Sequence, residues 1–91
     1  MKIPHREPTR VLRWVFRRND HAITCAIDTA GDQAFDVCVV PHWDVSASTI
    51  ERFEAMHCAF ERHAELARRL RDMGWVRTPE MTHRPPAAAA A

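Results

Sequence analysis

The stretch STIERFEAMHCAFERHAELARRLRDMG, residues 48–74, predicts one long helix that runs from Thr49 to about Met73. Ser48 and Glu51 have the spacing of a capping box, in which each side chain bonds a backbone amide near the other residue. No proline or glycine interrupts the run. The sequence therefore predicts a helix of 25 residues, around which the rest of the chain is organised.

The predicted end of this helix is Gly74, which can adopt the left-handed conformation while Trp75 folds back on Leu70. Apolar residues recur at helical spacing along the run and predict one buried stripe. These residues are Ile50, Phe53, Met56, Phe60, Ala64, Ala67 and Leu70. Phe60 is central in the stripe, so we expect it in the core where the helix crosses a sheet.

Three stretches before the helix alternate apolar and polar residues, which is typical of strands. They cover about residues 10–18, 22–28 and 34–40, with a two-residue turn at Asn19-Asp20 and a longer turn at residues 29–33. Keeping each strand's apolar face on one side predicts a single register. The predicted inner rows are Leu12–Ile27–Phe35, Trp14–Cys25–Val37 and Phe16–Ile23–Val39, and the predicted outer row is Arg13–Ala26–Asp36.

These elements predict a two-layer α+β fold of order β-β-β-α. A three-stranded antiparallel sheet is covered on one face by one long C-terminal helix. Residues 10–76 form the single domain, preceded by an N-terminal arm at 1–9 and followed by a disordered tail at 77–91. Nine inner apolar side chains supply the main driving force, since each contributes roughly 1.5–3 kcal/mol on full burial.

The outer sheet face is less polar than a solvated face normally is. In addition, a 25-residue helix is about 37 Å long, whereas a seven-residue strand spans about 23 Å. Both features predict a partner surface, and a second copy of the chain is the commonest partner. A different protein, or the N-terminal arm covering the face within one chain, stays an alternative. The predicted interface residues are Val11, Val15, Thr24, Cys38 and Val40.

Charge is segregated along the chain although the net charge is only +1. Lysine and arginine dominate residues 1–18, and residues 19–48 contain five aspartates without a lysine or arginine. Pairing between the two segments explains this without a ligand. The alternative is binding of single-stranded nucleic acid along the basic first strand, through Arg10, Arg13, Arg17 and Arg18. It is not favoured, because Trp14 and Phe16 fall on the predicted buried face.

Motifs for catalysis or metal binding are missing from the sequence, which contains neither CxxC nor HxxxH. Cys58 has no base set up by its spacing, because His57 should point to a different flank of the helix. Asp28 and Asp36 are explained by ion pairs with Arg10 and Arg13. No cofactor is expected, and a small enzyme or a metal-binding protein stays a third alternative.

The remaining features predict a cytoplasmic protein. No apolar run approaches the roughly 18 residues that a membrane span needs. The first eight residues contain no apolar segment of a secretory signal, and the odd count of three cysteines favours reduced thiols. The sequence therefore predicts a small, non-catalytic, homodimeric interaction or regulatory module.

Overall fold

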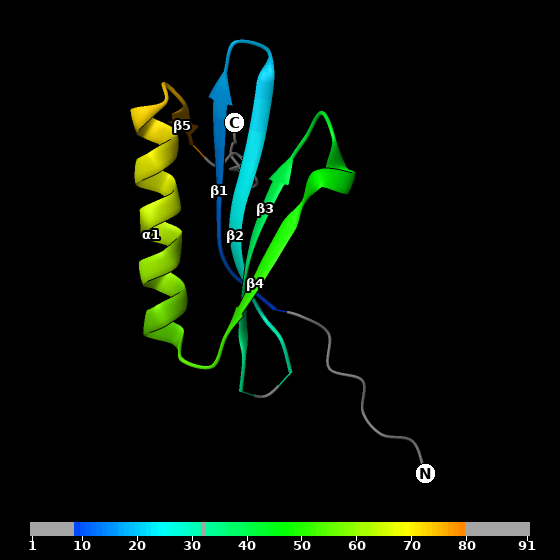
Figure 1. Cartoon of the computed structure of the whole chain (residues 1–91), viewed down its shortest axis with the longest axis vertical. Coiled ribbons are helices and arrows are strands. Elements are labelled where there is room, and N and C mark those ends of the chain that lie inside the picture. The colour runs from blue at the N-terminus through cyan, green and yellow to red at the C-terminus, as the bar shows by residue number, and fades with distance from the viewer. Residues whose placement is uncertain (1–8, 32, 80–91) are drawn as a thin grey trace, which may run out of the picture.

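The computed structural model describes residues 9–31 and 33–79. It is an α+β fold with one antiparallel sheet and one α-helix (Figure 1). The strands are β1 (Arg10–Arg18), β2 (His21–Thr29), β3 (Phe35–Pro41), β4 (Thr49–Phe53) and β5 (Val76–Thr78). The helix α1 is Met56–Asp72, and a 3-10 turn, η1, covers Val45–Ala47. In space the strand order is β4-β3-β2-β1-β5.

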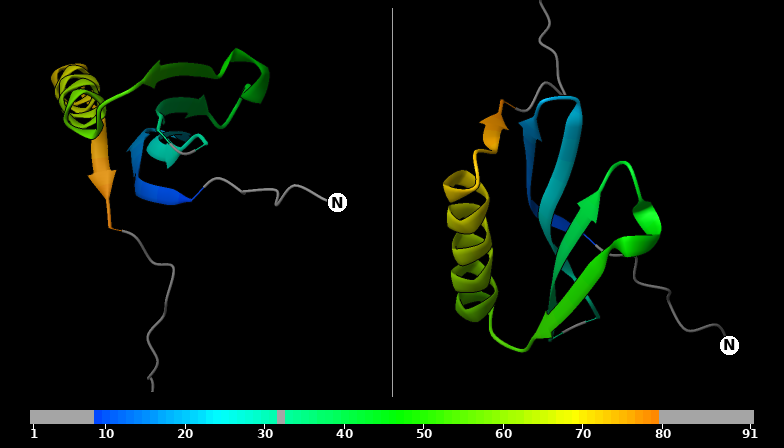
Figure 2. Two further views of the ribbon diagram at one scale, coloured as in Figure 1. Left: turned by 90° about the horizontal axis from the view of Figure 1, so that it is seen from below. Right: turned by 45° about the horizontal axis from the view of Figure 1, so that its top comes forward.

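The sheet is curved, and α1 stands beside it with β4 on one side and β5 on the other (Figure 2). Helix residues such as Ala59 and Ala67 pack against inward-facing side chains that include Phe16, Ile27 and Val37. The prediction of three strands under one covering helix is wrong in two respects. The sheet has five strands, and the helix does not lie flat over one face.

The register of the β1–β2 hairpin is confirmed. Its three inner pairs are Leu12 with Ile27, Trp14 with Cys25, and Phe16 with Ile23. Asn19 begins the two-residue turn with a φ of 55°, a conformation that asparagine tolerates better than most residues. Turn chemistry and apolar alternation therefore agreed on a single solution.

The predicted register between β2 and β3 is wrong by two residues. Ile27 lies opposite Val37, and Phe35 lies opposite Thr29. The connection begins one residue later than predicted, at Ala30, whose amide donates to the carbonyl of Ala34 at 2.8 Å. Shifting the register by two residues keeps every side chain on its predicted face. The alternation of apolar and polar residues therefore could not distinguish the observed register from the predicted one.

The predicted start of the helix is also wrong, because Thr49–Phe53 forms β4 and α1 begins at Met56. The capping box does not form: Ser48 donates its hydroxyl to the carbonyl of Val45 at 2.6 Å. Ile50 and Phe53 are three residues apart, which fits one helix face as well as opposite faces of a strand. Pairing with β3 settles the conformation, since it gives Phe53 a cross-strand partner in Phe35.

The helix begins seven residues later than predicted, and a different face of α1 is buried. Phe60, predicted to be a core residue, is 39% exposed, whereas the neighbouring Ala59 is fully buried. His63 takes a core position with only 2% of its surface exposed. The helix of 17 residues is about 25 Å long, so it does not overhang the sheet as predicted.

The predicted end of the helix is confirmed. Gly74 has a φ of +96° and donates to the carbonyl of Arg71 at 3.0 Å, while the amide of Trp75 donates to Leu70 at 2.9 Å. The chain then adds β5, which pairs with Val15, Phe16 and Arg17 of β1 although a tail was predicted beyond residue 76. The rest of the predicted tail (80–91) and residues 1–8 of the predicted arm lie outside the described residues.

Candidate functional site

The edge strand β4 is the first candidate interaction site. In the part of the chain that the structure describes, β3 is its only strand partner, so its other side has no β-ladder. Ile50 projects from the outer sheet face opposite Cys38 and is 65% exposed. The observed outer row is Arg13–Ala26–Cys38–Ile50, in place of the predicted row through Asp36. The apolar part of this row ends at an open edge.

The two charged residues of β4 are both paired within the chain. The Arg52 guanidinium donates to Asp36 from Nε at 2.9 Å and from a second nitrogen at 3.2 Å. Glu51 accepts from Nε of Arg62 on α1 at 2.7 Å. Charges normally help to prevent an edge from pairing with another strand. Here they are compensated internally, which leaves the edge less protected.

Four of the five predicted interface residues, Val15, Thr24, Cys38 and Val40, lie on the outer face. Val11 lies at an irregularity of β1 and packs against the inner cluster that contains Ile27 and Val37. Not all of the outer residues are accessible. Thr24 is only 7% exposed, and its hydroxyl lies 2.7 Å from Nε2 of His42. His42 therefore covers part of this face. The other four, Val11, Val15, Cys38 and Val40, are half-buried.

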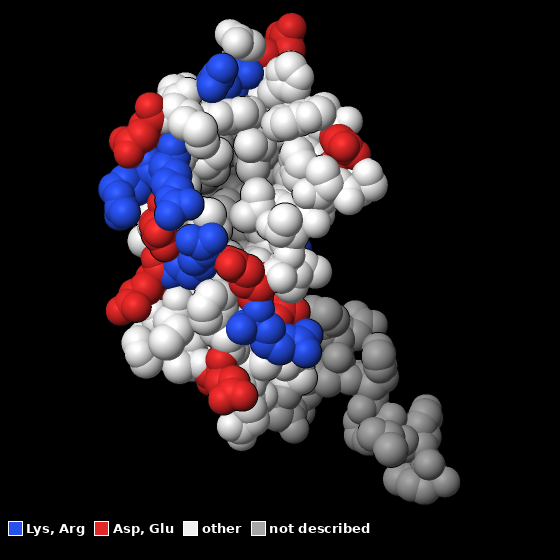
Figure 3. Space-filling model, in the orientation of Figure 1, with Lys and Arg blue, Asp and Glu red and all other residues white. Residues whose placement is uncertain are grey.

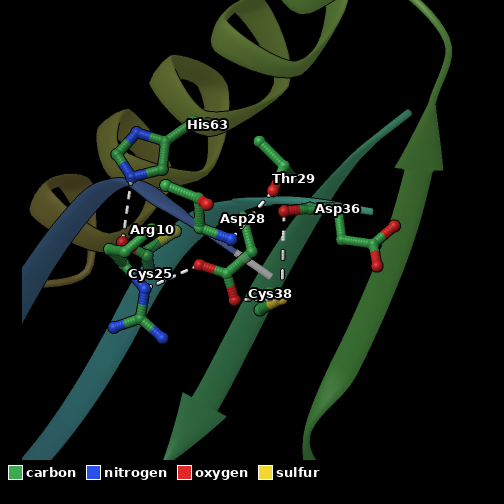
Figure 4. A network of polar contacts seen from close by, with 8 residues as sticks. Arg10, Cys25, Asp28, Thr29, Asp36, Cys38 and His63 are labelled. Atoms are coloured by element: carbon green, nitrogen blue, oxygen red, sulfur yellow. Dashed lines mark hydrogen bonds and ion pairs between the residues drawn. The ribbon is translucent and has the colours of Figure 1, made fainter. Parts of the chain in front are cut away.

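Asp28 and Asp36 lie directly opposite each other on β2 and β3, not in different rows as predicted. Arg10 donates to Asp28 at 2.6 Å, as predicted, whereas Arg52 rather than Arg13 pairs with Asp36. Figure 4 shows Cys38 beside Asp28, with its thiol donating to Oδ2 at 3.9 Å. Burial above all, and then the two carboxylates, raise the pKa of Cys38. The adjoining hollow of about 410 Å³ therefore contains a protonated thiol rather than a nucleophile.

The other described cysteines and histidines make only pairwise contacts. Burial raises the pKa of Cys25 to about 11, and its carbonyl accepts from Nε2 of His63 at 3.0 Å (Figure 4). Contrary to prediction, His57 does approach Cys58, with Nε2 3.5 Å from the sulfur. Among residues 9–31 and 33–79, no group of three or more histidine, cysteine or acidic side chains is arranged to hold a metal ion.

The four arginines proposed for nucleic acid differ in their contacts. Arg10 is held by Asp28, and Arg13 lies in the outer row beside Ala26. Arg17 is exposed near the hairpin turn. Arg18 donates to the carbonyl of Met73 at 2.8 Å and lies 5.8 Å from the ring centroid of Trp75.

A cluster of aromatic rings beside Arg18 was not predicted. Trp43 stacks on Trp75, with ring centroids 6.0 Å apart and planes inclined by 14°. His21 meets Trp43 edge-on at 4.7 Å. Trp43 therefore lies at the end of the fold nearest the hairpin turn. The two tryptophans are 32 positions apart in the chain, so no periodic signal connects them.

Comparison with known proteins gives no further information: no protein-family model, no curated protein and no solved structure matches this chain. Within residues 9–31 and 33–79, α1 is too short and too polar to cross a membrane. Function must therefore be argued from geometry and surface chemistry.

Proposed function

We propose that this protein is a small non-catalytic interaction module that forms a homodimer by pairing β4 with β4 of a second copy. The observation that carries the proposal is the open β4 edge, on which Ile50 is 65% exposed. Main-chain donors and acceptors on such an edge are recognised best by another extended strand. The three free thiols support a reducing compartment, and we place the module in the cytoplasm.

The features of β4 itself support strand pairing. Its five residues form a continuous ladder with β3, without a bulge that would twist the edge away. Proline is absent from Thr49–Phe53, so each residue retains its backbone N–H. The internal ion pairs of Glu51 and Arg52 remove much of the electrostatic cost of bringing up a second strand.

The register that we propose for the second copy has its twofold axis at Ile50. Two identical antiparallel strands meet on a twofold axis, so one residue lies opposite its own copy. An axis at Glu51 or Arg52 would oppose like charges, which destabilises a strand pair. An axis at Ile50 places the two exposed isoleucines opposite each other and Glu51 opposite Thr49 of the partner. The apolar outer row then continues from one sheet into the next.

Stacking of the outer faces is the other dimer that the surface allows. It would bury the half-exposed residues of that face, and a charge at Val15 would disrupt it. It would also have to accommodate His42, which lies against Thr24 on that face. Edge pairing through β4 does not require His42 to move. It should also tolerate a charge at Val15, because Val15 lies on β1, away from β4.

The oligomeric state and its dependence on surface charge test the proposal. A pair of five-residue strands should bury less than the roughly 800 Å² per partner of a standard interface. Light scattering is therefore measured from micromolar to millimolar protein. We expect the wild-type chain to reach a dimer mass and Ile50→Glu to stay monomeric. Val45→Glu is the matched control, because Val45 is 64% exposed but lies outside β4.

Two outcomes would contradict edge pairing. A monomer mass for the wild type at every concentration would exclude a homodimer of either kind. A dimer that survives Ile50→Glu and is lost in Val15→Glu would identify the stacked outer faces instead. Circular dichroism of each variant establishes that the sheet is retained.

A cross-link tests the register. With the axis at Ile50, the two Cα atoms at this position should lie about 4.5–5.5 Å apart, within disulfide range. Ile50→Cys should then form a covalent dimer on mild oxidation. The matched Arg52→Cys positions would be separated by about 13 Å and should not cross-link. Both are made with Cys38→Ser and Cys58→Ser, because Cys38 lies opposite Ile50 in the same protomer.

A further inference from the structure

Three segments of the chain converge at the end of the fold nearest the β1–β2 turn. The β1–β2 hairpin contributes Arg18, Asn19 and His21. The connection after β3 contributes Trp43, and the residue after the helix cap is Trp75. Together they line a hollow of about 320 Å³. This volume is at the lower end of the range for small-molecule sites.

The walls of this hollow are aromatic, and Trp43 is 53% exposed. Trp75 is anchored by packing on the buried cluster that contains Phe16 and Leu70. Trp43 in turn is held by its stacking on Trp75 and by the edge of His21. The hollow is therefore lined by a broad indole surface on a fixed support, which suits a flat aromatic ligand.

The cation beside these rings indicates the charge of the ligand. Arg18 is oriented by its hydrogen bond to the carbonyl of Met73, a neutral acceptor. Among residues 9–31 and 33–79, no carboxylate forms an ion pair with Arg18. Its charge is thus available to an anion, and it would repel a cationic ligand such as a quaternary ammonium group. Asn19 and His21 add polar groups for the edge of a ring.

We propose that this hollow binds a nucleotide unit, with an aromatic base stacked on Trp43 and its phosphate bound by Arg18. Base–aromatic stacking with an adjacent arginine is a general mode of recognising unpaired nucleotides. The unit is either a free mononucleotide or one residue of a single-stranded nucleic acid. The site is independent of β4, so its test does not depend on dimer formation.

Titration with adenosine 5′-monophosphate, adenosine and inorganic phosphate, each alone, tests the assignment. The chain has three tryptophans, whose indole N–H signals can be followed separately by NMR. We expect the monophosphate to shift the signals of Trp43 and Trp75 and to leave that of Trp14 unchanged. Adenosine should shift the same two signals at higher concentration, because it lacks the phosphate.

Two variants separate the base from the phosphate. Trp43→Ala should weaken binding of the monophosphate roughly 5- to 150-fold, the range expected for loss of one stacked base. Val45→Ala, on the neighbouring 3-10 turn, is its control and should bind normally. Arg18→Gln should reduce the affinity for the monophosphate to that for adenosine, and adenosine binding itself reports that the site is still folded. Arg17→Gln is the matched control, since Arg17 does not line the hollow.

A short oligodeoxyadenylate distinguishes the two sources. Tighter binding than that of the monophosphate, falling steeply with salt, identifies a single strand. Equal or weaker binding identifies the free mononucleotide. The proposal is overturned if no probe moves the Trp43 and Trp75 signals at millimolar concentration, or if Trp43→Ala binds as the wild type does.

Discussion

At one edge of the sheet β4 contributes five residues, Thr49–Phe53, and at the other β5 contributes three, Val76–Thr78. The β5 edge is protected by its shortness and by Pro79, which follows it directly and has no N–H to offer a further strand. β4 has neither protection. The β5 edge is thus protected where β5 covers β1 at residues 15–17, and we call it the closed edge. The β4 edge remains able to extend the sheet.

The packing beneath the two edges differs in the same direction. On the β5 side, Phe16 is fully buried and lies opposite Arg77, whose guanidinium covers the ring of Trp14 at 4.0 Å. The inner residues of β4 itself are the exposed Thr49 and Glu51 and the half-buried Phe53. The space-filling view shows charged side chains grouped along the helix, with a largely uncharged surface beside them (Figure 3). An edge with little packing beneath it gains most from a partner.

The largest effect that this comparison predicts is on core packing. Phe16→Ala should lower the free energy of unfolding by about 3–5 kcal/mol, because it leaves a cavity under the closed edge. Phe53→Ala should cost less than half as much, because part of this side chain is already in water. Urea unfolding monitored by circular dichroism measures both losses.

Both substitutions are best made with Ile50→Glu, so that dimer dissociation does not contribute to the measured stability. A loss at Phe53 as large as that at Phe16 would show that the two sides are packed equally well. The proposed reason for an open β4 edge would then fail.

An element was predicted correctly where two independent features of the sequence agreed on it. The β1–β2 hairpin had both a turn signal at Asn19 and apolar alternation, and its register was correct. For Ile50 and Phe53 the spacing of three satisfied a helix, and only the tertiary partner Phe35 distinguished a strand. That error also displaced the buried stripe of α1, so Phe60 was assigned to the core in place of Ala59 and His63.

The candidate sites were less predictable because they depend on long-range contacts. The open edge at Ile50 follows from the position of β4 in the sheet, which alternation does not encode. Trp43 and Trp75 meet only because the sheet and the end of α1 bring them together. A useful signal was available in the sequence nonetheless: two tryptophans just beyond predicted elements, rather than within an apolar stripe, suggest rings at the end of a fold.

A second, intermediate effect concerns His63, which packs on the β5 side against Trp14, with ring centroids 5.0 Å apart. Burial lowers the pKa of His63 below its usual value, and the nearby Arg77 contributes in the same direction, against the opposing hydrogen bond to Cys25. The unfolded chain therefore binds a proton first as the pH falls through about 6.5. Stability should decrease below that pH until the folded-state pKa is passed.

Unfolding at a series of pH values measures this dependence. His63→Gln retains an N–H donor for the carbonyl of Cys25 and should flatten the acid slope. His57→Gln, on the exposed part of the same helix, should leave the slope as in the wild type. If both variants behave alike, the acid sensitivity does not arise beneath the closed edge.

The smallest effect is expected at the closed edge itself, where Thr78 of β5 donates its hydroxyl to the carbonyl of Val15 at 3.1 Å. Thr78→Val keeps the size and strand preference of the side chain and removes only the donor, so it should cost about 0.5–1.5 kcal/mol. Thr49→Val makes the same change on β4, where the hydroxyl is in an exposed residue. With Ile50→Glu present in both, Thr49→Val should leave the urea midpoint nearly unchanged. Equal losses of stability in the two variants would mean that the Thr78 hydroxyl does not stabilise β5 specifically. The β5 edge would then be protected only by its backbone pairing with β1 and by Pro79.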